Sequence, residues 1–143
     1  MKIALGSDHA GVRYKEIIGR YLKSLGHDVH DLGPYTETPA VDYPQYIRPV
    51  AERVAAGEFE RGIVLGGSGN GEAIVANRVK GIRCGLCWNV ESAQLTREHN
   101  NANIISIGQR MVTEETAIAI VNAFLNTPFG GGRHERRIKA IDA

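Results

Sequence analysis

The chain of 143 residues is about the size of one domain, and 43% of its residues are hydrophobic, which is enough for a core without disulfides or a structural metal. Lysine and arginine number 17 against 16 aspartates and glutamates, so the formal charge of +1 argues against nucleic acid or an anionic membrane as a partner. The N-terminus turns polar before a signal peptide could form, and no apolar run approaches the roughly 18 residues of a membrane span. We therefore expect a cytoplasmic protein.

Short apolar runs alternate with stretches of helical period along the chain. The expected strands are 2–6, 27–32, 62–65, 82–88 and 103–107, and the expected helices are 12–25, 44–56, 72–79, 91–99 and 113–125. Strict alternation of this kind predicts a parallel sheet with right-handed crossovers and helices on both faces. We therefore predict one α/β domain over residues 1–143, with a five-stranded, doubly wound parallel sheet of flavodoxin-like or Rossmann-like type.

Several helix ends carry recognisable signals. Gly26 stands where a C-terminal glycine of the first helix would, and Asp42 and Pro44 suit the cap and first turn of the second. Pro49 falls inside that second helix and should kink it. Residues 127–132 predict a hinge, followed by a short basic helix over 133–141 that could swing away from the body.

In such a fold ligands bind outside the carboxyl ends of the strands. At that end of the third expected strand the chain has four glycines within Gly66–Gly71, followed by Glu72. This backbone can turn tightly and aim several N–H groups at one negatively charged atom. The pattern G-x-G-x-x-G is absent, and the Walker pattern fails because Glu72 replaces its lysine. We interpret the loop as a cradle for an oxyanion that forms during reaction, with Glu72 as the base. The alternative is a plain glycine turn with Glu72 favoured by the helix dipole.

Other polar residues stand near the ends of elements. Asp8 suits either a helix cap or a site, and His9 beside it can donate to a phosphate or move protons near neutral pH. His99 closes the fourth helix, where by itself it would only complement the dipole. Arg110 follows the fifth strand on the ligand face.

Two sequence pairs have competing explanations. Arg133 and Arg137 lie one turn apart on the last helix, which suits the oxygens of one phosphate, although a solvated basic end is also common. Positive charge that is only local fits a small phosphorylated metabolite better than DNA or RNA. Cys84 and Cys87 form a C-x-x-C on an expected strand, where positions three apart face opposite sides, so we interpret them as buried structural thiols rather than a redox or zinc pair.

Taken together, these residues resemble the sugar-phosphate isomerases of the ribose-5-phosphate isomerase type B group, which includes the galactose-6-phosphate isomerase subunits. The resemblance covers nearly the whole chain and rests on residues 6–11, 66–72, 97–102 and 108–110 and on the basic tail. In one branch of that family the base is a cysteine at the position matching Gly66. This chain is similar to the other branch, whose base is the glutamate matching Glu72, and neither of its cysteines takes that role.

The resemblance implies an aldose–ketose isomerase, in the first place of ribose 5-phosphate and ribulose 5-phosphate, that works through ring opening and an enediolate. It implies that Glu72 moves a proton between C2 and C1 and that His99 is the acid for ring opening. The implied binding residues are Gly67, Ser68, Gly69, Asn70 and Gly71 for the enediolate, Asp8 and Asn100 for sugar hydroxyls, and His9, Arg110, Arg133 and Arg137 for the phosphate. The family also implies no metal or organic cofactor, and a homodimer or dimer of dimers with shared active sites.

Two alternatives to this function stay open. A hexose 6-phosphate of the allose or galactose type could be the substrate, depending on the room around residues such as Tyr43 and Asn100. A non-catalytic sugar-phosphate-binding protein would keep the cradle but have no use for Glu72. A flavodoxin-type module would need a Ser/Thr-rich loop after the first strand, and a phosphoreceiver domain would need an acidic residue where Gly66 stands.

Overall fold

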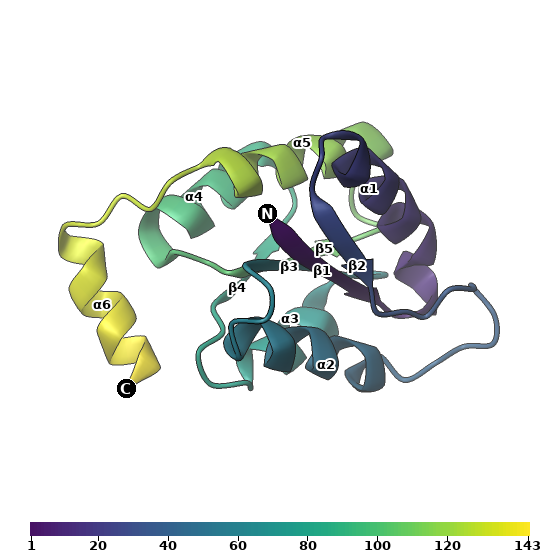
Figure 1. Ribbon diagram of the computed structural model, residues 1–143, viewed down its shortest axis with the longest axis horizontal. Coiled ribbons are helices and arrows are strands. Elements are labelled where there is room, and N and C mark those ends of the chain that lie inside the picture. The colour runs from purple at the N-terminus through teal and green to yellow at the C-terminus, as the bar shows by residue number, and fades with distance from the viewer.

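All five predicted strands join one parallel sheet in the computed structural model, which describes residues 1–143 (Figure 1). The strands are β1 Lys2–Ser7, β2 Asp28–Asp31, β3 Arg61–Gly66, β4 Cys84–Cys87 and β5 Ile104–Gly108. The helices are α1 Val12–Ser24, α2 Pro44–Ala55, α3 Asn70–Asn77, α4 Val90–Asn100, α5 Glu114–Asn126 and α6 Arg133–Asp142, with a 3-10 turn η1 over His9–Gly11. The predicted doubly wound α/β fold is confirmed. The strand order is β2-β1-β3-β5-β4, so β5 lies between β3 and β4 rather than at the edge.

The sheet separates two hydrophobic layers. Helices α1, α4 and α5 cover one face and α2 and α3 cover the other (Figure 1). Successive residues of β1 alternate between the layers, since Ile3 and Leu5 join the first and Ala4 joins the second. The central strands are buried on both faces, which explains why they read as continuous apolar runs.

Strands β1 and β3 form the point where the direction of winding changes. The chain leaves β1 for β2 on one side, whereas β3 connects past β5 to β4 on the other. Such a switch point opens a crevice at the carboxyl ends of the two strands. The N–H of Asp8, directly after β1, donates to the carbonyl of Leu65 near the end of β3 at 3.1 Å, so the loops that follow these strands are joined at this edge.

Most predicted helix ends are close to the observed ones, with corrections at α2 and α3. Gly26 ends α1 at φ +89°, and its N–H donates to the carbonyl of Lys23, as a C-terminal glycine should. Helix α2 has Pro44 in its first turn and continues through Pro49 to Ala55, but the side chain of Asp42 makes no cap hydrogen bond and was wrongly predicted as the cap.

The start of α3 was predicted two residues late. Gly69 turns the chain at φ +84°, and its carbonyl already accepts from the N–H of Ala73 at 3.1 Å. Asn70 and Gly71 are therefore the first residues of the helix rather than loop, and Glu72 is its third residue.

The two cysteines face opposite sides of the sheet, as predicted, and Cys87 is buried whereas Cys84 is partly buried. Cys87 packs in the layer under α1, α4 and α5, whereas Cys84 packs against the layer under α2 and α3. Both are free thiols, and burial raises the pKa of both, that of Cys87 to about 12. None of the helices has the length and apolar character needed to cross a bilayer.

Candidate active site

The carboxylate of Glu72 lies directly over the backbone of Gly66. A Cβ on Gly66 would stand 1.9 Å from Oε1 of Glu72, so the carboxylate occupies the volume that a side chain at position 66 would need. Glu72 is only 3% exposed. Burial raises the pKa of its carboxyl, the negative charge of Asp8 raises it further, and a backbone hydrogen bond within Glu72 partly opposes both. A buried carboxyl with a raised pKa is suited to take up and return a proton.

The glycine loop presents unused hydrogen-bond donors next to this carboxylate. The backbone N–H groups of Gly67, Ser68, Gly69 and Gly71 donate to no carbonyl or side chain of the chain, whereas the N–H of Asn70 donates to Oγ of Ser68 at 3.2 Å. The first turn of a helix leaves such donors free and adds the positive end of the helix dipole. The arrangement can therefore stabilise an oxyanion, as the glycine spacing indicates.

Asp8 and His9 lie at the same edge of the sheet, and Asp8 is both a cap and a neighbour of the base. Its Oδ1 accepts from the N–H of Gly11 at 3.0 Å, which starts η1, and its charge acts on Glu72. Nδ1 of His9 accepts from the N–H of Val41 at 3.1 Å, so neutral His9 carries its proton on Nε2 and can donate from there. The contact with Val41 was not predicted, because nothing in a sequence marks a backbone partner 32 residues away.

Arg110 and Tyr43 border the glycine loop on two sides. A Cβ on Gly67 would lie 3.0 Å from Nη1 of Arg110, and the N–H of Arg110 donates to the carbonyl of Gly67 at 3.0 Å. A Cβ on Gly71 would lie 2.8 Å from the hydroxyl of Tyr43. Both glycines are therefore needed for close approach of a neighbouring side chain, and a guanidinium and a phenol flank the cradle.

The remaining predicted residues form a second group around the end of α4. His99 and Arg133 line a groove of about 480 Å³ together with the connection over 128–132. The rings of His99 and His134 stack with centroids 4.4 Å apart. Desolvation, His99 and the positive charges of Arg133 and Arg137 lower the pKa of His134. Asn100 is exposed at the last position of α4.

Within one chain the two groups lie at opposite edges of the sheet. Glu72 packs at the carboxyl end of β3, whereas Asn100 accepts from Arg83, which directly precedes β4, at the amino edge. The four residue steps of β5 alone separate the two edges by roughly 13 Å. One chain therefore does not bring His99, Asn100, Arg133 and Arg137 together with Glu72.

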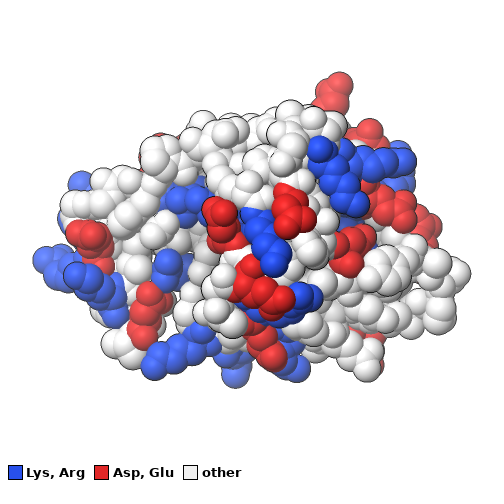
Figure 2. All heavy atoms as spheres, in the orientation of Figure 1, with Lys and Arg blue, Asp and Glu red and all other residues white.

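Helix α6 carries four basic residues, Arg133, Arg136, Arg137 and Lys139. Figure 2 shows blue side chains at the end of the molecule where α6 lies, with red side chains between them. No three His, Cys, Asp or Glu side chains come together as a metal site would require.

The fold and site define an α/β protein with a buried carboxylate of raised pKa, a glycine loop with unused backbone donors and a local basic surface. The ribose/galactose isomerase family model matches residues 3–141. Ribose-5-phosphate isomerase B of Mycolicibacterium paratuberculosis is 51% identical over 142 residues, which are 99% of this chain and 89% of that protein.

Two solved structures extend the comparison. The ribose 5-phosphate isomerase of Thermotoga maritima superposes with a TM-score of 0.96 at 48% identity and covers 99% of this chain and 97% of its own. Ribose-5-phosphate isomerase B of Mycoplasma genitalium, solved with bound ribulose 5-phosphate, has a TM-score of 0.95 at 39% identity, and the match covers 99% of this chain and 93% of that one. The chain belongs to the ribose/galactose isomerase family.

Proposed function

We propose that this protein is an aldose–ketose isomerase that interconverts ribose 5-phosphate and ribulose 5-phosphate. The observation that carries the proposal is the buried carboxylate of Glu72 beside four unused backbone donors of the glycine loop. Relatives described as ribose-5-phosphate isomerase B support the substrate, as does the Mycoplasma genitalium complex with ribulose 5-phosphate. The whole chain, residues 1–143, forms one isomerase domain, in which residues 127–143 are a connecting segment and tail helix.

The reaction follows from the chemistry of these groups. His99 donates a proton to the ring oxygen as the bond between that oxygen and C1 breaks, and the C1 hydroxyl loses its proton to water, which frees the aldehyde at C1. Glu72 then removes the proton from C2, and the N–H groups of Gly67, Ser68, Gly69 and Gly71 stabilise the enediolate that results. The same carboxyl returns a proton to C1 while the proton of the C2 hydroxyl moves to the oxygen on C1, which gives the ketose. A raised pKa of Glu72 suits the first of these steps, because it makes the carboxylate a stronger base toward the C2 proton.

Substrate binding uses groups from both edges of the sheet. Asp8 and Asn100 bind sugar hydroxyls, and Asn70 completes the cradle at the start of α3. His9 and Arg110 bind the phosphate from one side, and Arg133 and Arg137 bind it from the other. Binding energy at the remote phosphate orients the reacting carbons against Glu72.

Because the two groups lie at opposite edges of one chain, the active site is shared between subunits of a homodimer or dimer of dimers. An apolar surface supports this assembly, since Trp88 is 60% and Met111 65% exposed. Both line a groove of about 190 Å³ that also touches Ser68 and Asn70, so the apolar surface is continuous with the cradle. Free cysteines fit a cytoplasmic location, where thiols stay reduced.

The first test assays isomerisation with ribose, ribulose, allose and galactose phosphates side by side. The pentose pair should turn over fastest, and Glu72→Gln should lower the turnover rate by at least roughly 10²-fold while binding of the sugar phosphate is retained. A preference for a hexose 6-phosphate would show that the substrate is of the allose or galactose type instead. Binding without turnover by the wild-type protein would leave only a sugar-phosphate-binding protein.

The second test asks whether the site is shared. Glu72→Ala and Arg137→Ala chains are mixed under conditions that allow subunit exchange. A mixed dimer then has one site with both defects and one with neither, so activity should recover toward roughly one quarter of the wild-type value. Demonstrated exchange without recovery would show that each site is built from one chain.

A further inference from the structure

Helix α6 carries the tail arginines but has few attachments to the body. It follows the connection 127–132 and stands beside the sheet rather than on either of its faces (Figure 1). Ile138 is its only buried residue, and Gly132 at its N-terminus provides no side-chain cap. One buried apolar side chain stabilises the docking of a helix of ten residues only weakly, so the position of α6 depends on other contacts.

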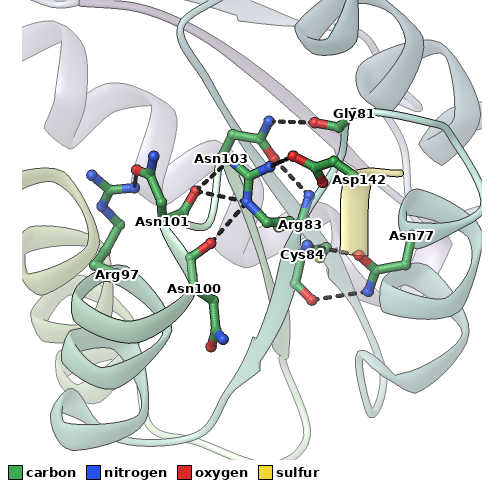
Figure 3. A network of polar contacts seen from close by, with 9 residues as sticks. All are labelled: Asn77, Gly81, Arg83, Cys84, Arg97, Asn100, Asn101, Asn103 and Asp142. Atoms are coloured by element: carbon green, nitrogen blue, oxygen red, sulfur yellow. Dashed lines mark hydrogen bonds and ion pairs between the residues drawn. The ribbon is translucent and has the colours of Figure 1, made fainter. Parts of the chain in front are cut away.

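Besides the stacking of His134 on His99, one guanidinium joins the far end of α6 to the end of α4 (Figure 3). Nη1 of Arg83 donates to Oδ2 of Asp142 at 2.7 Å, Nε donates to the carbonyl of Asn100 at 2.8 Å, and Nη2 donates to the carbonyl of Asn101 at 3.1 Å. These carbonyls belong to the last turn of α4, which has no helical partners for them. Arg83 therefore binds the end of α4 and the end of α6 at the same time.

The backbone of Arg83 is held in place by hydrogen bonds to Asn103. The N–H of Arg83 donates to Oδ1 of Asn103 at 2.9 Å, and the N–H of Asn103 donates to the carbonyl of Arg83 at 3.0 Å. The side chain of Arg83 is 15% exposed and that of Asp142 is 38% exposed, so the pair is only partly screened by water. Charge-assisted bonds from one planar fork are the stronger and more directional kind.

Asp142 occupies a position in α6 where a carboxylate by itself is unfavourable. Asp142 is the last residue of α6, and a carboxylate at a helix C-terminus is disfavoured by the helix dipole. It makes the only ion pair of a helix whose other charges, apart from Glu135, are positive. Without Arg83, this carboxylate would weaken the end of the helix.

We propose that Arg83 and Asp142 form a positioning pair that docks α6 against the end of α4, so that Asn100 and the tail arginines engage one substrate as a unit. The inference rests on the function proposed above, in which Asn100 binds the sugar and Arg133 and Arg137 bind the phosphate. Neither Arg83 nor Asp142 contacts the substrate itself. When α6 is undocked, substrate affinity falls by the fraction of molecules that remain competent.

The test compares Asp142→Asn with the matched variant Glu135→Gln, which removes an acidic group of the same helix that makes no ion pair. Asp142→Asn should raise both KM for ribose 5-phosphate and the inhibition constant of inorganic phosphate by about 3- to 10-fold, with kcat changed less than about twofold. Glu135→Gln should change neither by more than about twofold. Asp142→Glu should restore most of the affinity, and a second substitution, Arg83→Gln, should add little to Asp142→Asn.

Through-space electrostatics predicts the opposite sign, because loss of a negative charge near the tail arginines would strengthen phosphate binding and lower KM. A lower or unchanged KM in Asp142→Asn would therefore overturn the positioning pair. Hydrogen exchange of the amides of α6 gives a readout that needs no activity, and exchange should be faster in Asp142→Asn than in Glu135→Gln. If the wild-type protein lacks isomerase activity, the proposed function fails, while the exchange comparison still decides whether the pair docks α6.

Discussion

One methyl group added at Gly66 should disable the base without unfolding the protein. In Gly66→Ala the new Cβ would stand 1.9 Å from Oε1 and 2.3 Å from Cδ of Glu72, whereas ordinary contact begins at 3.4 Å. The carboxylate must therefore retreat by about 1.5 Å. Because the obstructing atoms are the end of a flexible side chain and Gly66 does not have a positive φ, the backbone can stay as it is.

The size of the effect follows from this displacement. A misplacement of about 1 Å in a reacting group can lower the rate on the order of 10²-fold, equal to roughly 2.7 kcal/mol of transition-state stabilisation. The assay is the rate of ribulose 5-phosphate formation, measured next to a thermal unfolding midpoint. Gly19→Ala in α1 is the matched control, since its Cβ would lie 3.3 Å from Cδ1 of Leu5 in β1, away from Glu72.

A double-variant cycle separates displacement of the base from other effects of the methyl group. If Gly66→Ala acts only through Glu72, then Gly66→Ala combined with Glu72→Gln should be no slower than Glu72→Gln alone. Near-normal turnover in Gly66→Ala would refute the reasoning. So would a double variant slower by the product of the two single effects, because the methyl group would then obstruct the substrate and not the carboxylate.

Three further results are expected. Asp8→Asn keeps a cap residue but removes the charge that raises the pKa of Glu72, so the acidic limb of the pH–rate profile should move to lower pH, and an unmoved limb would exclude this coupling. The raised pKa of Glu72 means that the folded chain binds this proton more tightly than the unfolded chain. The contribution of the carboxyl to stability is therefore full below its ordinary pKa and is lost as pH rises through the raised pKa. We expect Glu72→Gln to unfold at a higher temperature than wild type at pH 7, and the difference in unfolding temperature to shrink in acid. Chelators should leave isomerisation unchanged, because the enediolate has backbone donors, and loss that only a divalent ion restores would contradict this mechanism.

The periodicity of the sequence was sufficient to predict the helices, the strands and their layers, because the spacing of apolar residues determines which face of each element is buried. It could not order the strands, since β4 and β5 keep the same alternation whichever neighbour they have. The glycine loop beside a carboxylate was predictable because the glycines and Glu72 are adjacent in the sequence. The residue at which the loop ends and α3 begins was not predictable, because any glycine can adopt the φ of +84° that Gly69 has and no glycine must adopt it.

Contacts between distant polar side chains were the part that sequence reasoning missed. Arg83 and Asp142 are separated by 59 positions, and neither residue differs from an ordinary charged surface residue until the fold brings them to 2.7 Å. The separation of His99 from Glu72 has a simpler cause. Helix α4 runs back from the carboxyl edge, so a residue at its end must lie at the amino edge.

The opposite locations of Glu72 and His99 also bear on how activity depends on concentration. In the shared-site assembly that we propose, a lone chain holds two incomplete halves, so dilution that dissociates the assembly should abolish turnover rather than reduce it to a monomer level. Mass action then makes specific activity a measure of the associated fraction. A sugar phosphate that contacts both chains stabilises the assembled state by the free energy of its own binding, so substrate should hold the enzyme together at concentrations where the empty protein falls apart.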